Sequence, residues 1–110
     1  MANTGDDQIR AALRSGDPVA LEMVWDAYAE DLFTLLLSML RSRSDAEDVL
    51  MDVFVRVAQR CGRVATARDL RAYLLRMARN LGLNAIKRRR RSQSLAPDEL
   101  LRIEPDLRGA

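Results

Sequence analysis

Apolar residues recur at spacings of three and four along most of the chain, the period of a helix with one buried face. The cleanest repeat comprises Ala46, Val49, Leu50, Val53, Phe54 and Val57. An earlier stripe comprises Leu21, Val24, Trp25, Tyr28, Leu32, Leu35, Leu36 and Met39. A later one comprises Leu70, Leu74, Met77, Leu81 and Ala85. The pattern predicts three main helices, each with a stripe that faces a shared core.

Capping residues indicate where these helices begin. Asp17 followed by Pro18 is a strong start signal, because aspartate caps a helix and proline suits its first position. The helix that follows is expected to run to about Leu40. Ser44 or Asp45 is expected to cap the next helix, whose first turn is acidic, as the helix dipole favours.

Glycine and polar residues predict the connections. Gly62 is a plausible helix stop, and residues Gly62 to Arg68 are expected to form a loop before a last helix that starts near Asp69. A short first helix is expected from Asp6 or Asp7 to about Ser15–Gly16. In the tail, Pro97-Asp98-Glu99 could begin one further turn of helix.

The predicted fold class is therefore all-α: a compact helical bundle of three main helices plus a short N-terminal helix. At 110 residues the chain is long enough for one core. We expect one helical domain over residues 1–91 and a C-terminal tail, or the start of an interdomain linker, over 92–110.

Composition argues against several classes of protein. The chain contains no histidine and a single cysteine, Cys61, so it lacks the commonest general base and the residues for a zinc site or a disulfide framework. We expect no enzyme activity, no catalytic residues, no metal and no cofactor. The first residues are polar and acidic, and the run Leu32 to Leu40 is too short to span a bilayer. A cytoplasmic protein without membrane insertion is expected.

Charge divides the chain more sharply than its net charge of +2 suggests. Residues 56–91 carry twelve basic side chains and one acid, whereas residues 1–55 carry eleven acids and four arginines. Such a chain can present one surface to a polyanion and another to a basic protein. The charge pattern thus favours an adaptor between nucleic acid and a protein partner.

The last predicted helix combines aromatic, amide and cationic side chains beside its buried face. At about 100° per residue, Asn80 and Asn84 lie close to Tyr73 in angle, and Arg76 and Lys87 lie just beyond. Amides can read base edges, an aromatic ring can stack on an unpaired base, and cations hold phosphates. The alternative is equally open: Tyr73 packs at a core edge and both asparagines tolerate partial burial.

Two motifs resemble region 2 of bacterial sigma-70-type factors, most closely the extracytoplasmic-function group. They are SDAEDVLMDVFVRV at residues 44–57 and LRAYLLRMARNL at 70–81, followed by a basic run. The resemblance covers about Asp17 to Arg91. It implies an all-helical domain that binds the clamp helices of the RNA polymerase β′ subunit and that recognises and melts the promoter −10 element.

The resemblance also implies roles for individual residues. The acidic helix would contact polymerase through Asp45, Glu47, Asp48 and Asp52, with Val53 and Phe54 as packing. For these acids, helix capping and solubility are the alternative roles.

The loop from Gly62 to Arg68 matches the place where the family captures a flipped base of the non-template strand, and Asn80 matches a position beside that base. The expected DNA-binding residues are Arg63, Arg68, Tyr73, Arg76, Asn80, Asn84, Lys87, Arg88, Arg89 and Arg90. The basic run within this set would bind any polyanion without sequence preference.

The sequence departs from the family at several places. Tyr73 replaces a usual tryptophan, Met51 a common glutamine and Asp52 a common glutamate. Nothing after Ser92 resembles the second domain that reads the −35 element. Two alternatives follow: a regulatory decoy that binds polymerase or an anti-sigma factor without supporting initiation, and a general nucleic-acid-binding bundle. An anti-sigma factor is a further candidate partner in either case.

Overall fold

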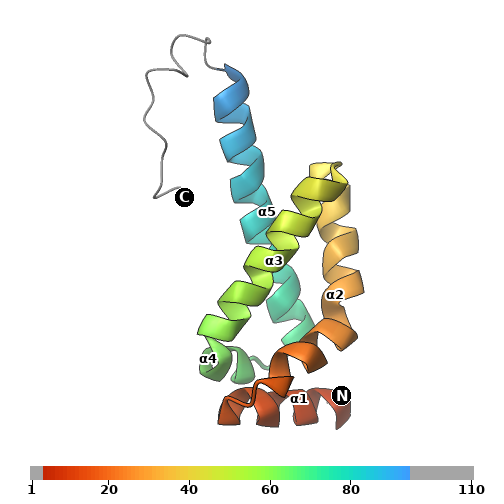
Figure 1. The fold of residues 1–110 in the computed structure, drawn as a ribbon, viewed down its shortest axis with the longest axis vertical. Helices are drawn as coiled ribbons and strands as arrows, with labels where there is room; N and C mark the ends of the chain where they lie inside the picture. The colour runs from red at the N-terminus through yellow and green to blue at the C-terminus, as the bar shows by residue number, and fades with distance from the viewer. Residues whose placement is uncertain (1–3, 95–110) are drawn as a thin grey trace.

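The computed structural model describes residues 4–94, and every regular element within them is a helix. In chain order the helices are α1 (Thr4–Ser15), α2 (Val19–Leu40), α3 (Arg43–Gln59), α4 (Cys61–Ala65) and α5 (Leu70–Ser94). α2 and α3 run antiparallel, α5 packs against both, and α1 and α4 lie at the end of the bundle opposite the α2–α3 turn (Figure 1). The predicted all-α bundle is confirmed, with α4 as an addition.

The core is formed by the predicted stripes of α3 and α5 and by most of the stripe of α2. All six residues of the α3 repeat are buried. On α5, Leu70, Leu74 and Ala78 are fully inaccessible, whereas Met77, Leu81 and Ala85 pack against the core from its edge. Burial of a leucine side chain contributes roughly 1.5–3 kcal/mol, so these faces hold the three long helices together.

Trp25 does not lie in the core as its place in the stripe predicted; it is 43% exposed. Val24, Tyr28 and Leu32, at spacings of four, form the buried line of α2. Trp25 is about 100° around the helix from Val24 and therefore lies on the neighbouring line of residues.

α2 begins at Val19, one residue later than the sequence predicts, with Pro18 as the residue before the helix. The Asp17 carboxylate accepts a hydrogen bond from the backbone N–H of Val19 at 3.0 Å, and the Asp17 carbonyl accepts from Ala20 at 2.9 Å. α2 ends at Leu40, and Arg41 follows in the left-handed conformation at φ 54°. This residue turns the chain toward α3.

The predicted cap of α3 is wrong by two or three residues. Ser42, with φ −144° and ψ 121°, is the extended residue before the helix, and its Oγ accepts from the backbone N–H of Asp45 at 3.2 Å. Ser44 and Asp45 already lie inside the first turn. The left-handed Arg41 places the start earlier than the acidic run suggested.

Replacing Ser42 by alanine is expected to lower the free energy of unfolding by about 1 kcal/mol, the usual worth of a serine cap. Ser44→Ala is the matched control and should cost clearly less, because Ser44 caps no helix. Urea denaturation of both variants measures the difference. Equal losses would contradict the assignment of Ser42 as the cap.

The predicted loop over Gly62 to Arg68 is wrong in its first half. Residues 61–65 form α4, and the connection to α5 is only the four-residue segment 66–69, the α4–α5 loop. Val64 and Ala65 are buried, so the segment is held by packing against α1 and the core despite its glycine. The last helix starts near Asp69 as expected, and the Asp69 carboxylate caps it by accepting from the backbone N–H of Ala72 at 3.0 Å.

α5 comes unusually close to α2 at Gly82. A Cβ atom at this position would lie 2.9 Å from Met39 Cε and 3.2 Å from Leu36 Cδ2. The glycine therefore lets the middle of α5 pack directly on the end of α2.

Two further sequence predictions concern the C-terminal tail and membrane insertion. The possible turn at Pro97-Asp98-Glu99 lies outside the described residues. Across residues 4–94, the longest apolar stretches of helix fall short of what a bilayer span requires.

Candidate functional site

The four acids assigned to polymerase binding all lie on α3, but in different surroundings. Glu47, Asp48 and Asp52 are exposed, whereas Asp45 is half-buried. Glu47 pairs with Arg43 at 3.5 Å, one turn earlier on the same helix. Asp45 pairs instead with Arg89 near the end of α5. Asp48 and Asp52 form no ion pair with any residue of the described part of the chain.

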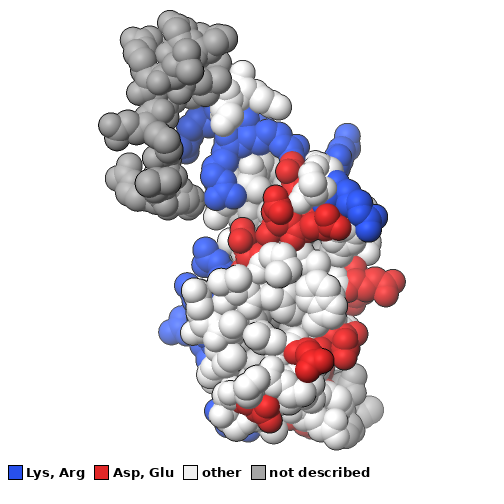
Figure 2. Space-filling model, viewed as in Figure 1, with Lys and Arg blue, Asp and Glu red and all other residues white. Residues whose placement is uncertain are grey.

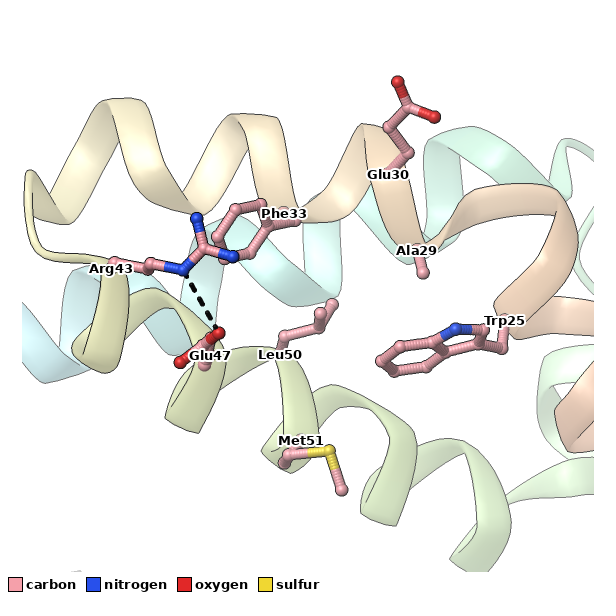
Figure 3. Close-up of a pocket in the computed structure, with 8 residues that line it drawn as sticks. All are labelled: Trp25, Ala29, Glu30, Phe33, Arg43, Glu47, Leu50 and Met51. Atoms are coloured by element: carbon pink, nitrogen blue, oxygen red, sulfur yellow. Dashed lines mark ion pairs between the residues drawn. The ribbon is translucent and has the colours of Figure 1, made fainter.

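An apolar groove of about 440 Å³ lies between α2 and α3, and of the four acids Glu47 lines it. Its lining residues are Trp25, Ala29, Glu30, Phe33, Arg43, Glu47, Leu50 and Met51. Figure 3 shows Trp25 and Met51 at one end of the groove, and Phe33 with the Arg43–Glu47 ion pair at the other. The groove therefore offers an open apolar floor, with the Arg43–Glu47 ion pair at one end and Glu30 on its α2 side.

Aromatic contacts hold the groove in shape. The Trp25 ring packs on Phe54 with centroids 4.9 Å apart and planes inclined by 51°. The Arg43 guanidinium lies 5.7 Å from the centroid of Phe33, within the range of a cation–π contact. Met51 is 56% exposed, more than any other large apolar side chain among the described residues. Exposed, contiguous apolar surface of this kind is typical of a docking site.

Sequence reasoning missed this groove. The apolar stripe predicted that Trp25 lies in the core, and Met51 stood out only as a departure from the family pattern. The signal was present as a second line on α2, with Trp25, Ala29, Phe33 and Leu37 at spacings of four beside the buried line. Facing it, Met51 and Val55 form an exposed apolar line on α3.

Figure 2 shows acidic side chains gathered around the apolar surface of this face, with basic side chains toward the C-terminal end of α5. The charge division of the sequence is therefore a division in space. Like charges one turn apart on a helix, such as Asp48 and Asp52, repel one another slightly. A cationic partner would relieve this repulsion.

Eight of the ten residues assigned to DNA lie on one continuous helix, α5. Arg76, Asn80, Asn84 and Lys87 are exposed along α5, and Tyr73 in its first turn is half-buried. We call these five residues the α5 ridge. Their spacings of three and four place them along one side of the helix.

The remaining DNA candidates lie at the two ends of α5. Arg63 on α4 and Arg68 in the α4–α5 loop are both exposed, close in sequence to Tyr73. Arg88 and Arg90 lie at the far end of the helix and are exposed as well.

Arg89 differs from its neighbours because it is held within the fold. It is half-buried, it pairs with Asp45, and its Nη1 donates to the carbonyl oxygen of Leu40 at 3.3 Å. The structure thus joins one residue assigned to polymerase with one assigned to DNA. Together they fasten the end of α5 to the α2–α3 turn.

Residues 24–92 match the model of the Sigma-70 region 2 family, which covers more than half of the chain, so the chain belongs to this family. The match includes α3, most of α2 and nearly all of α5, but not α1. It confirms the predicted resemblance. The chain carries a sigma-factor domain, and sigma factors are a non-enzymatic class that acts in transcription initiation.

One curated relative is the ECF RNA polymerase sigma factor SigX of Bacillus subtilis (strain 168). It is 24% identical over an alignment that covers 72% of this chain and 50% of SigX. The chain therefore spans about half the length of this relative. No solved structure matches the chain.

Proposed function

We propose that this domain binds core RNA polymerase through α3 and the apolar groove, with the clamp helices of the β′ subunit as its partner. We further propose that the α4–α5 loop and the α5 ridge bind the non-template strand of the promoter −10 element. The observation that carries the proposal is the pair of exposed acids Asp48 and Asp52, each next in sequence to a residue that lines the open apolar groove, inside the segment that matches region 2.

The polymerase surface fits an amphipathic helix with basic flanks. Such a helix would lay its apolar side chains against Trp25, Phe33 and Met51, as helices do in hydrophobic grooves. Its cations would meet Asp48 and Asp52, whose charges are not used within the described residues. Complementary charge of this kind fixes register and raises the rate of association.

The α5 ridge is long enough to bind a short single strand. Tyr73 and Lys87 are fourteen residues apart on α5. This separation is about 21 Å at 1.5 Å per residue, the rise of about six stacked nucleotides. Cations at both ends of the ridge would hold phosphates, and the amides between them would face bases. Opening would then proceed by trapping, since unpairing costs a few kcal/mol that contacts to the free strand offset.

A binding experiment with purified core polymerase tests the first half of the proposal. The full chain should bind core polymerase and also an isolated β′ clamp-helix fragment, and each should compete with the other. Failure to bind either would sink the polymerase role.

Initiation assays separate the proposal from the decoy. On a template whose −10 region is already mismatched, the chain should allow core polymerase to start RNA synthesis at a defined position. A decoy would bind polymerase and only inhibit such synthesis.

A further inference from the structure

Arg10 of α1 reaches across to the loop that precedes α5. Its Nε donates to the carbonyl oxygen of Ala67 at 3.1 Å, and its Nη2 donates to the carbonyl oxygen of Arg68 at 2.9 Å. The partners are 57 and 58 residues away in sequence. One guanidinium thus holds two consecutive backbone carbonyls of the α4–α5 loop.

The contact is built into the fold. The Arg10 side chain is only 15% exposed, so water competes weakly for its hydrogen bonds. Its third contact, Nη1 to the Asp7 carboxylate at 3.3 Å, fixes the orientation of the planar guanidinium. The fork geometry of arginine suits this double contact, whereas lysine presents a single compact ammonium on a flexible stem and lacks the rigid fork.

α1 itself is firmly anchored in the fold, so the backbone that carries Arg10 is held in place. Ile9 and Leu13 are buried in the core, one residue before and three residues after Arg10. The Tyr28 hydroxyl of α2 donates to the Asp6 carboxylate. Burial, reinforced by that hydrogen bond, raises the pKa of Tyr28 well above its ordinary value, so the phenol stays protonated and remains a donor.

The two ends of the α4–α5 loop are held by hydrogen bonds to α4 and α5. Arg10 holds the backbone of Ala67 and Arg68 between those ends. The backbone N–H of Ala67 donates to Val64 at 3.1 Å, and Asp69 caps α5 through Ala72 and Tyr73. The Ala67 and Arg68 carbonyls point to α1, which leaves the Arg68 side chain exposed. Side-chain readout by this loop therefore depends on where Arg10 holds its backbone.

We propose that Arg10 is a positioning residue that sets the conformation of the α4–α5 loop and, through it, the selectivity of that loop for an unpaired base. This inference rests on the proposed role of the loop in capturing a −10 base. It assigns α1, which lies outside the segment that matches the family, a part in promoter selectivity.

Hydrogen exchange tests the positioning without any reference to DNA. In Arg10→Lys, the amides of Ala67, Ala72 and Tyr73 should exchange about tenfold faster, because local opening of the loop becomes easier. Arg14→Lys is the matched control, an exposed arginine on the same helix, and should leave these amides unchanged. Asp7→Ala, at an exposed position that does not threaten folding, should give a smaller increase. Unchanged exchange in both Arg10→Lys and Asp7→Ala would overturn the inference.

Selection of single strands tests the consequence. The complex of the chain with core polymerase is mixed with a randomised pool of single-stranded DNA, and the bound strands are sequenced. Arg10→Lys should lower the enrichment at one base position by about tenfold, within the range that one base contact supplies, while affinity for polymerase stays the same. Uniform weakening of all strands together with polymerase would indicate a general loss of structure and overturn the inference.

Failure of the proposed −10 recognition and failure of the proposed role of Arg10 give different experimental results. If the wild-type complex enriches no sequence, the proposed −10 recognition fails, and hydrogen exchange still decides whether Arg10 holds the loop. If the wild-type complex enriches a sequence that Arg10→Lys retains in full, only the role of Arg10 fails.

Discussion

Replacing Asp48 by arginine is expected to weaken binding of the chain to core RNA polymerase by about 10- to 100-fold. Asp48 is exposed, follows the groove-lining Glu47 in sequence and forms no ion pair with the described residues, so its charge is available to a partner. Arginine at this position would face the cations proposed for the partner, and juxtaposed like charges at an interface cost several kcal/mol. Titration of labelled chain with core polymerase measures the change.

Glu22→Arg is the matched control, because it changes the net charge equally. Glu22 is exposed on α2, and it does not line the groove. Its variant should bind polymerase within about twofold of the wild type, since a distant surface charge changes affinity little. Equal weakening by both variants would mean that net charge, and not the α3 surface, governs binding.

Replacing Gly82 by valine is expected to lower the free energy of unfolding by about 1–3 kcal/mol, the usual cost of overpacking a close contact. The new Cβ would meet Met39 Cε at 2.9 Å and Leu36 Cδ2 at 3.2 Å. Met39 is flexible and can move its terminal methyl group, but the branched Cγ atoms of valine leave it less room. α5 would therefore have to shift away from α2. Urea denaturation monitored by helical circular dichroism measures the loss.

Gly62→Val provides the matched control for this substitution. Gly62 also lies within a helix, and nothing lies within 4 Å of a Cβ atom built there. Because valine forms helices slightly better than glycine, the control should be neutral or slightly stabilising. A loss at Gly62 as large as that at Gly82 would show that close packing of α5 on α2 is not the cause.

The main helices could be predicted because the residues that pack into the core recur in the sequence at helical spacing. The repeat from Ala46 to Val57 is buried in full, since each of these side chains faces the core at helical spacing. The start of the same helix was missed because Ser42, Ser44 and Asp45 are all good caps within four residues. Only the left-handed Arg41 decides between them, and no local pattern marks an arginine for that conformation.

α4 could not be predicted from the helix propensity of its own residues, because a five-residue helix with a glycine is unstable alone. Val64 and Ala65 were the available signal, an apolar pair inside an otherwise polar segment. Their burial depends on α1, which precedes them by about fifty residues.

The candidate sites were predicted as lists of residues, not as surfaces. Charge placed the acids on α3 and the cations on α5, but it could not show that Asp45 and Arg89 pair with each other. Nor could it show that Arg10 lies under the α4–α5 loop. Both contacts join distant parts of the chain, and single-sequence periodicity carries no information about them.

The pairing of Asp45 with Arg89 gives Asp45 a role different from that of the other acids of α3. Asp45 helps to hold the end of α5 against the α2–α3 turn, whereas Asp48 and Asp52 remain available to a partner. A half-buried ion pair that water still reaches contributes roughly 0–1 kcal/mol, so its main consequence is the placement of α5. The basic end of the helix is thereby fixed relative to the surface proposed for polymerase.

The central claim is that this domain, once bound to polymerase, selects the sequence of an unpaired strand. The most direct measurement is the enrichment of sequences from a randomised single-stranded DNA pool by the complex of the chain with core polymerase, compared with core polymerase alone. We predict a short enriched motif that requires the chain and that weakens when Asn80 is replaced by alanine. Enrichment no greater than that of core polymerase alone would contradict it.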